Sequence, residues 1–445
     1  MSESSKRHVR RTVARHGQLP KSNPVRQALA FLAIALSTVL VAGLGVIGYV
    51  VYDLTSTFAS ENTVDLDGQS EAPAIAELDN RGFNILLAGL DVCDWEHHEI
   101  MGNRCSDDPD DYDENGLELE SARSDVLMLM HISPEPRRVT VVSFPRDLVT
   151  YIPACEDEEG NVGGDGREMI NAAYSYGGLN CTVKTVEQLT GQTIDHAASV
   201  TWGGVIDITN AIGGVTVCVA GGIHDPESGA DFAAGENTIS GDRALAFLRT
   251  RHGVDDGSDI ARISNQQVFM SALVNKMVSD EVLGNWGTVY NLARAVVENI
   301  EKTSALGDPI YLAQMALAVR DVPYEDFVFV QYPVFVDPAD ANRRIADEQS
   351  AQQLFDAINA NVPIQLSAEG TGSVAQDEAD GGSGEQAPEG ETAPDAGAPA
   401  SPEEQPAPSD PATPAPEESA GPVELGSNTP GQTAADRRCS AGNLG

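Results

Sequence analysis

The segment DVLMLMHISPEPRRVTVVSF, residues 125–144, contains two runs of aliphatic and β-branched residues separated by a proline-containing link. The runs at 125–132 and 138–144 have the length of strands, and a short link rich in turn-forming residues joins strands that pair antiparallel. The segment therefore predicts a β-hairpin. A further run, NILLAGL at 84–90, precedes the hairpin and predicts a third strand.

Helical and extended patterns alternate after the hairpin. Helices are predicted at 181–191, 202–214 and 240–253 and from Asp259 onward, and strands at 194–200 and 214–220. Ser240 is expected to be an N-cap, and Gly191 and Gly253 are expected to end their helices. Strands and helices mixed throughout one core-sized segment indicate a single α/β domain, with helices packed on a mixed β-sheet. We assign this domain to residues 81–366.

An uncharged run from Gln27 to Tyr52 follows seven basic residues near the N-terminus. Its length suits an apolar helix that spans a bilayer, whereas a cleaved signal peptide usually has a shorter apolar region. We predict a cytoplasmic segment at 1–27, a transmembrane signal anchor at 28–52 and a polar stalk at 53–80, with cleavage as the alternative. The basic flank stays inside the cell, so the C-terminal part of this single-pass membrane protein is predicted to be extracellular.

The chain is acidic, with a formal net charge of −41, and its composition changes beyond residue 366. Residues 367–445 contain 15 acidic and two basic residues and no aromatic residue. Such a segment buries too little apolar surface to offset its conformational entropy, so a disordered, acidic, proline-rich tail is predicted. The negative charge also argues against nucleic-acid binding.

All six cysteines follow the predicted anchor. Their spacing lacks the paired pattern of a zinc site, and an oxidising exterior favours disulfides. Cys93 and Cys105 are predicted to pair. Two of Cys155, Cys181 and Cys218 are also expected to pair, and the sequence leaves the choice open.

Charged residues flank the first three strands at one end. Asp91 follows the first strand, Arg123 and Asp125 stand at the start of the second, and Arg146 and Asp147 follow the third. If the second strand runs antiparallel to both others, these residues meet at one edge of the sheet. Two carboxylates there suit Mg²⁺, which shares its remaining positions with water and phosphate. The alternative is that Asp125 only pairs with a neighbouring arginine.

The segment FLRTRHGVDDGSDIARISNQQ, residues 247–267, contains three arginines in a chain that has few basic residues. On the helix that begins at Asp259, this residue shares one stripe with Arg262 and Gln266. Arg249 and Arg251 lie near the end of the preceding helix. Several guanidinium groups aimed at one place suit a pyrophosphate, whose oxygens they bind in pairs. The alternative is a set of surface ion pairs with nearby aspartates, each contributing little.

The motifs occur in an order that resembles the LytR-CpsA-Psr family over residues 81–365: NILLAGLD, ARSDVLMLMHI, VVSFPRDL, MINAAYSYGG, GDRALAFLRTRH and SDIARISNQQ. This resemblance implies an extracytoplasmic glycopolymer phosphotransferase in a Gram-positive, actinobacterial cell envelope. Such enzymes move a glycopolymer from a polyprenyl pyrophosphate carrier to peptidoglycan, or to an envelope protein, through a phosphodiester bond. It also implies a mixed sheet between helices, with a hydrophobic pocket for the lipid.

Carried over by position, the resemblance implies Mg²⁺ ligands and a pyrophosphate-binding set. The Mg²⁺ ligands are Asp91 and Asp125. The pyrophosphate-binding residues are Arg123, Arg146, Arg249, Arg251, Arg262 and Gln266. The predicted catalytic residues are Arg249, Arg251, Asp259 and Arg262, with Asp259 either accepting the proton of the attacking hydroxyl or orienting an arginine. Asn265 stands where relatives commonly have arginine, so one head-group contact is missing or is supplied elsewhere.

Two other functions remain open from the sequence. With water as the acceptor, the same residues would make a pyrophosphatase that hydrolyses the lipid carrier. Without turnover, the domain would be a lipid-binding regulator of the cell envelope.

Overall fold

The computed structural model describes residues 63–66, 78–101, 105–112, 116–118, 122–157, 160–277, 279–366, 373–376 and 421–444. The predicted cytoplasmic segment and signal anchor lie outside these residues. Within them, no helix combines the length and the apolar composition that crossing a bilayer requires.

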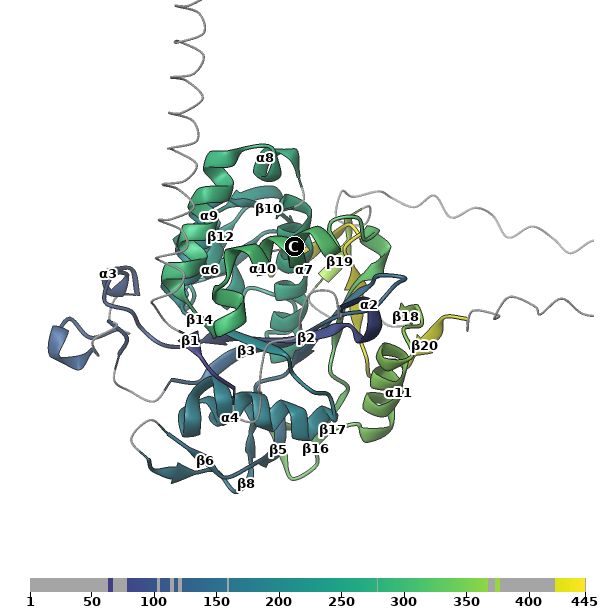
Figure 1. The fold of residues 1–445 in the computed structure, drawn as a ribbon. Coiled ribbons are helices and arrows are strands. Elements are labelled where there is room, and N and C mark those ends of the chain that lie inside the picture. The colour runs from purple at the N-terminus through teal and green to yellow at the C-terminus, as the bar shows by residue number, and fades with distance from the viewer. Residues whose placement is uncertain are drawn as a thin grey trace, which may run out of the picture. The chain divides into compact units, whose positions relative to one another are not determined.

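A mixed sheet of eight strands organises the domain (Figure 1). From edge to edge the strands are β1 (Thr63–Val64), β14 (Ile300–Thr303), β9 (His196–Val200), β2 (Phe83–Leu90), β3 (Ser124–Ile132), β4 (Val139–Phe144), β15 (Phe327–Gln331) and β21 (Gly431–Thr433). The pairs β2–β3 and β3–β4 are antiparallel, whereas β2–β9 and β4–β15 are parallel. The predicted hairpin and the mixed sheet are both confirmed.

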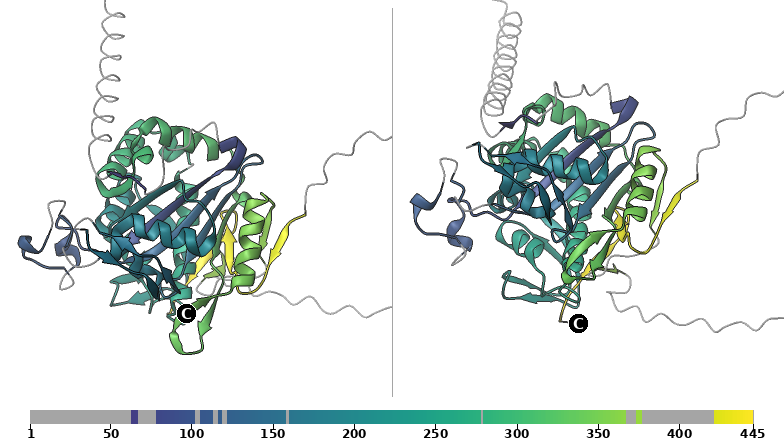
Figure 2. Two further views of the ribbon diagram at one scale, coloured as in Figure 1. Left: turned by 60° about the horizontal axis from the view of Figure 1, so that its bottom comes forward. Right: turned by 90° about the horizontal axis from the view of Figure 1, so that it is seen from below.

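Helices pack on both faces of this sheet (Figures 1 and 2). Because side chains alternate along a strand, Leu86 of β2 packs in the core beneath α4 (Ala173–Thr190) and α11 (Glu348–Asn359). Its neighbour Ile85 packs in the opposite core, with residues of α7 (Asp259–Met277) and α10 (Pro309–Val319). Each face of the central strands is therefore buried.

A smaller sheet lies against α6 (Asp242–Arg249) and α7. Its strands, in order, are β13 (Gly235–Ile239), β10 (Val215–Ala220), β22 (Arg438–Ala441) and β19 (Ser373–Ala375). Phe247 of α6 and Phe269 of α7 are buried in one core with Val217 and Val219 of β10. This packing fixes the two helices that carry the arginines of segment 247–267.

The remaining α-helices have between 4 and 14 residues, and the remaining strands form two-stranded ribbons. The helices are α2 (Leu78–Arg81), α3 (His98–Met101), α5 (Trp202–Ala211), α8 (Asp280–Leu283) and α9 (Trp286–Asn299). The ribbons are β5 (Val149–Ile152) with β8 (Gly166–Met169), β6 (Cys155–Glu156) with β7 (Val162–Gly163), β11 (Ile223–Asp225) with β12 (Ala230–Phe232), β16 (Val334–Asp337) with β17 (Asp340–Ala346), and β18 (Ile364–Leu366) with β20 (Val423–Leu425).

The prediction of a disordered tail from residue 367 is wrong for residues 373–376 and 421–444. Strand β21 pairs with β15 at the edge of the large sheet, and β22 pairs with both β10 and β19. The composition averaged over the tail concealed this folded part, because only Glu424 and Asp436 of its acidic residues lie there. The predicted stalk also differs in part, since Thr63–Val64 pairs with β14.

Three disulfides cross-link the described chain. Cys93–Cys105 forms as predicted, and Cys155–Cys181 is the pair realised among the alternatives. The third, Cys218–Cys439, joins β10 to β22 across a sequence separation of 221 residues. No local pattern predicted this bond, since its second cysteine lies in the predicted tail.

The predicted helix ends are right at one position and wrong at two. Gly191 follows α4 with φ 69°, the left-handed conformation that glycine adopts most easily. Helix α6 begins after Gly241, not after Ser240, and ends at Arg249 with Thr250 as its C-cap. Residues 250–258, named here the arginine loop, are therefore a loop between α6 and α7.

Candidate active site

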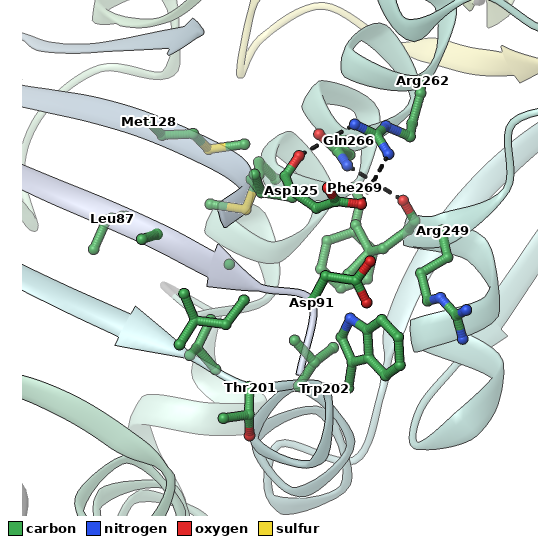
Figure 3. Close-up of a pocket in the computed structure, with 18 of the residues that line it drawn as sticks. Leu87, Asp91, Asp125, Met128, Thr201, Trp202, Arg249, Arg262, Gln266 and Phe269 are labelled. Carbon is green, nitrogen blue, oxygen red and sulfur yellow. Dashed lines mark hydrogen bonds and ion pairs between the residues drawn. The ribbon is translucent and has the colours of Figure 1, made fainter. Parts of the chain in front are cut away.

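A cavity of about 550 Å³ lies between the large sheet and helices α5, α6 and α7 (Figure 3). Apolar side chains line much of it, among them Leu87, Met128, Ile208, Phe269 and Leu273. Charged side chains gather at the end toward which β2 runs, away from Leu87 and Met128. The cavity therefore has an apolar chamber with charge at one end, and we call it the donor cavity.

Seven predicted site residues line the donor cavity: Asp91, Asp125, Arg146, Arg249, Arg251, Arg262 and Gln266. Arg123 lies outside it, in an adjoining polar pocket. Asp259 lines neither space and is buried, with 4% of its surface exposed. The expected convergence of charged residues from three strands and two helices is therefore found, with Asp259 standing behind the others.

The antiparallel pairing of β2 and β3 brings the two aspartates to one sheet edge. Leu90 pairs with Ser124, and the Asp91 backbone N–H donates to the Arg123 carbonyl oxygen at 2.9 Å. Asp91 thus follows the end of β2, and Asp125 is the second residue of the neighbouring strand β3. Both side chains reach the same space (Figure 3). This is the edge that the alternating strand directions predicted.

Two arginines and two aspartates form an alternating network at the cavity wall, with Asp259 behind the other three. Arg146 Nη1 lies 2.8 Å from Asp125 Oδ2, and its Nε lies 3.4 Å from Asp259 Oδ1. Arg262 Nη2 lies 2.7 Å from Asp259 Oδ1, and its Nη1 lies 3.5 Å from Asp125 Oδ2. Both guanidinium groups are thus held by the carboxylates of Asp125 and Asp259, and Arg146 Nε also lies 3.9 Å from Asp147 Oδ1. Asp125 therefore forms an ion pair with Arg146, as one alternative predicted, and both residues also line the cavity.

The network keeps Arg146 charged. Burial by itself lowers the pKa of this guanidinium, but the carboxylates of Asp125 and Asp259 outweigh burial and raise the pKa above its ordinary value. A permanently charged arginine at the cavity wall is what binding of a phosphate oxygen requires.

Arg249 and Arg251 are held by different contacts. The Arg249 guanidinium lies over the Trp202 ring, 4.1 Å from its centroid, where the negative face of the indole attracts a cation. The Arg251 side chain donates from Nε to the Gly257 carbonyl oxygen at 2.8 Å. Its Nη groups form no ion pair with the described residues, so they are available to a ligand in the donor cavity.

Asp225 fixes the start of the arginine loop. Its Oδ2 accepts from the Thr250 hydroxyl at 2.8 Å and from the Arg251 backbone N–H at 3.0 Å. Burial alone raises the pKa of this carboxyl, but these hydrogen bonds stabilise the charged form and lower the pKa below its ordinary value. Asp225 is therefore an ionised anchor for the backbone that carries Arg251.

The C-terminal segment braces the other side of this loop. The Asp255 N–H donates to the Ala441 carbonyl oxygen at 2.9 Å, and Asn443 Nδ2 donates to the His252 carbonyl oxygen at 3.1 Å. Asn265, which is fully buried, donates to the Phe247 carbonyl oxygen at 2.7 Å and accepts from the Ser440 hydroxyl. Asn265 thus faces away from the cavity and supports α6 and β22.

The sequence reasoning missed two residues that shape the site. Trp202 opens α5 directly after its N-cap, Thr201, and the sequence marked this segment only as a helix. Asp225 was not among the predicted site residues. No local sequence pattern could indicate either residue. Trp202 contacts Arg249 and Asp225 contacts Arg251, and each contact joins segments that are distant in the sequence.

The sequence of this chain is similar to a family model and to individual known proteins. The LytR_cpsA_psr family model matches residues 48–359. The probable cell wall biosynthesis protein LcpB of Corynebacterium glutamicum is 30% identical over 319 residues, which are 72% of this chain and 70% of that protein. A polyisoprenyl-teichoic acid–peptidoglycan teichoic acid transferase, TagU of Bacillus mycoides, is 29% identical over 64% of this chain and 82% of its own length.

Among solved structures, protein gbs0355 from Streptococcus agalactiae has a TM-score of 0.50 and 21% identity. The match covers 65% of this chain and 90% of that one, and it supports the fold alone. Together with the family model and LcpB, the ordered motifs and their convergence on one cavity lead to a single assignment. This chain belongs to the LytR_cpsA_psr family.

Proposed function

We propose that this protein is a phosphotransferase that moves a glycopolymer from a polyprenyl pyrophosphate carrier to peptidoglycan. The observation that carries the proposal is the donor cavity, where an apolar chamber ends at four arginines: Arg146, Arg249, Arg251 and Arg262. A lipid chain suits the chamber, and a diphosphate suits the guanidinium groups. The name of TagU describes a transfer of this kind.

The reaction follows from the same charges. An acceptor hydroxyl attacks the phosphorus attached to the sugar, the bond to the bridging oxygen breaks, and polyprenyl phosphate leaves. Negative charge increases on the leaving phosphate and on the peripheral oxygens. Arginines that are already oriented stabilise this charge without reorganising, which is how a preorganised site lowers a barrier.

Asp259 is assigned to orienting an arginine, not to accepting the proton. Its carboxylate is buried, lies 2.7 Å from the Arg262 guanidinium and lines neither the donor cavity nor the adjoining polar pocket. A general base must reach the proton that it removes. Asp259 instead fixes Arg262, and also contacts Arg146, at the cavity wall.

The donor set at the sheet edge fits Mg²⁺. Asp91 and Asp125 line the same space. Asp125 forms ion pairs with Arg146 and Arg262 through its Oδ2 atom. Mg²⁺ is commonly held by one or two protein carboxylates and takes its remaining ligands from water and phosphate. These two aspartates would hold Mg²⁺, which supplies charge neutralisation for the diphosphate.

The predicted signal anchor at 28–52 would keep the enzyme at the membrane that contains its lipid carrier. An envelope protein in place of peptidoglycan is the alternative acceptor.

Product analysis tests the proposal. Purified full-length protein receives a polyprenyl pyrophosphate-linked glycan and peptidoglycan in buffer with Mg²⁺. We expect a glycan linked to peptidoglycan through a phosphodiester, in amounts equal to the polyprenyl phosphate released, and loss of product after chelation. Glycan phosphate without linked product would identify a pyrophosphatase, and bound donor without release would identify a lipid-binding protein.

A further inference from the structure

A second pocket, of about 400 Å³, adjoins the donor cavity and shares Asp91, Asp125 and Arg146 with it. Its other walls include Asp147, Asn171 and Arg343. We propose that this space is the acceptor pocket, which binds a sugar of the acceptor glycan and presents its hydroxyl at the shared residues. The proposal rests on the proposed phosphotransferase function and adds where the second substrate binds.

The two spaces differ in chemistry. The donor cavity has an apolar chamber, whereas the second pocket is lined by charged and amide side chains, with Met169 as its single apolar side chain among the described residues. Aspartates accept hydrogen bonds from hydroxyl groups, and arginines donate to hydroxyl or carbonyl oxygens. Such a mixture suits a polyhydroxylated sugar with carbonyl substituents and excludes a lipid chain.

Asn171 points to a ligand. It is 5% exposed, and its Oδ1 has no hydrogen-bond partner among the described residues. A buried carbonyl oxygen without a donor is unfavourable, and native proteins satisfy nearly all such groups. The backbone at this position is fixed, because the Ile170 N–H donates to the Leu148 carbonyl oxygen at 2.8 Å. A hydroxyl or amide of the acceptor would supply the missing donor.

Arg343 supplies a cation to the acceptor pocket. Its Nε lies 3.8 Å from Asp340 Oδ2, its Nη1 contacts the Met169 sulfur, and 36% of its side chain is exposed. A distant carboxylate and a thioether satisfy a guanidinium group poorly, since a thioether sulfur is a weak acceptor. Hydroxyl or carbonyl oxygens of a sugar would be better partners.

Asp147 supplies a carboxylate to the same pocket. Its backbone is tied to β17, because the Arg344 N–H donates to the Asp147 carbonyl oxygen at 3.0 Å. Burial, with help from the Asp259 charge, raises the pKa of the Asp147 carboxyl above its ordinary value. A more basic carboxylate is a better proton acceptor.

The two spaces meet where the reaction must occur. The acceptor oxygen forms a bond to the phosphorus held at the shared residues, and the bond from this phosphorus to the bridging oxygen breaks. Polyprenyl phosphate leaves with the electron pair into the donor cavity. The hydroxyl proton passes to the Asp147 carboxylate, which lines the acceptor pocket and not the donor cavity.

The test separates acceptor binding from donor binding. Full-length protein is loaded with a farnesyl pyrophosphate-linked disaccharide, and uncross-linked peptidoglycan glycan chains are titrated as acceptor. Asn171→Leu and Arg343→Gln are expected to raise the acceptor KM, and the Kd of the glycan chains for the donor-loaded protein, by about tenfold or more. The donor Kd is expected to stay within about twofold of the wild-type value.

Arg344→Gln is the matched control, because this neighbouring arginine lies in the same strand, donates to the Ala341 and Arg343 carbonyl oxygens and does not line the pocket. Its acceptor Kd should match the wild type. Unchanged acceptor Kd in both pocket variants, or an equal loss of donor affinity, would overturn the acceptor pocket. Because the acceptor Kd is measured directly, this conclusion holds even if no linked product forms, an outcome that would refute the phosphotransferase function instead.

Discussion

The Arg249 guanidinium lies 4.1 Å from the centre of the Trp202 indole ring, so the last residue of α6 contacts the first residue of α5 (Figure 3). Both side chains line the donor cavity. The contact places the guanidinium group over an aromatic face, which attracts the cation without cancelling its charge. Arg146 and Arg262, by contrast, share the carboxylates of Asp125 and Asp259.

Replacing Trp202 should weaken the hold on Arg249. We expect Trp202→Leu to lower kcat/KM for the donor by about 3- to 30-fold, corresponding to the usual range of a cation–π contact. Trp202→Phe should recover part of the loss, since a phenyl ring retains an aromatic face. Trp95→Leu is the control, because Trp95 stacks on His98 outside the cavity. Equal effects of the leucine and phenylalanine variants would argue against the orienting role.

Arg251 is expected to bind the diphosphate directly. Arg251→Ala should reduce transfer by about 100-fold or more while the thermal unfolding midpoint stays unchanged, because the side chain has one hydrogen bond within the described part of the chain, to Gly257. Lysine at this position should restore little, since it lacks the planar fork. Arg320→Ala is the control, an exposed residue paired with Asp321. Normal transfer by the alanine variant would remove Arg251 from the site.

The pH profile distinguishes the two roles that the sequence left open for Asp259. If this carboxylate orients Arg262, Asp259→Asn lowers kcat by about 10- to 100-fold, and the shape of the kcat/KM profile is unchanged. If it were the general base, the acidic limb of the profile would disappear in the variant. Steady-state kinetics between about pH 5 and 9 on both proteins distinguishes the two roles.

Two buried histidines predict how stability depends on pH. Burial lowers the pKa of His131 and of His196 to about 4 in the folded protein. The unfolded chain, with histidine pKa near 6.5, binds these protons first, so stability is present above about pH 6.5 and decreases as the pH falls toward about 4. Each histidine contributes up to about 1.4 kcal/mol per pH unit in that window.

Urea unfolding at a series of pH values checks this dependence. His131→Asn should remove one histidine's share of the slope, although the variant also loses a hydrogen bond from the ring to Asn84. A slope between about pH 4 and 6.5 equal to that of the wild type would mean that His131 is not the proton-binding group.

The Cys218–Cys439 disulfide should contribute more to stability than the Cys93–Cys105 bond. The first closes a separation of 221 residues and the second a separation of 12. Because a longer closed loop restricts the unfolded chain more, replacing Cys218 and Cys439 with serine should lower the unfolding free energy by about 2–5 kcal/mol. Denaturant titration of both double-serine variants measures the difference. A larger loss in the Cys93/Cys105 variant would contradict the expectation.

Local patterns in the sequence accounted for the centre of the sheet and for most of the charged cluster. The proline-containing turn fixed the direction of β4 relative to β3, and alternating directions placed Asp91 beside Asp125. Helical spacing placed Arg262 and Gln266 on one stripe. In each case the information lay within a few tens of residues, where turn chemistry and periodicity act.

Contacts between distant segments were beyond such patterns. The strand at Gly431–Thr433 is short and has no hydrophobic alternation, and its place beside β15 depends on the edge that it completes. Helical spacing also could not tell that Asp259 faces Arg146 instead of the cavity, because that depends on how α7 packs on the sheet. Asn265 stands where relatives commonly have arginine, and it accepts a hydrogen bond from Ser440, which is 175 residues away in the sequence.

The β15–β21 pairing also sets an order of events during synthesis. Residues 327–331 leave the ribosome long before residues 431–433, so the rim of the sheet exposes unpaired amides and carbonyls throughout the interval. An exposed strand edge invites pairing with other chains, and delayed closure prolongs that hazard. A premature stop codon between these two segments would therefore yield a protein in which the edge of β15 stays unpaired and can pair with other chains.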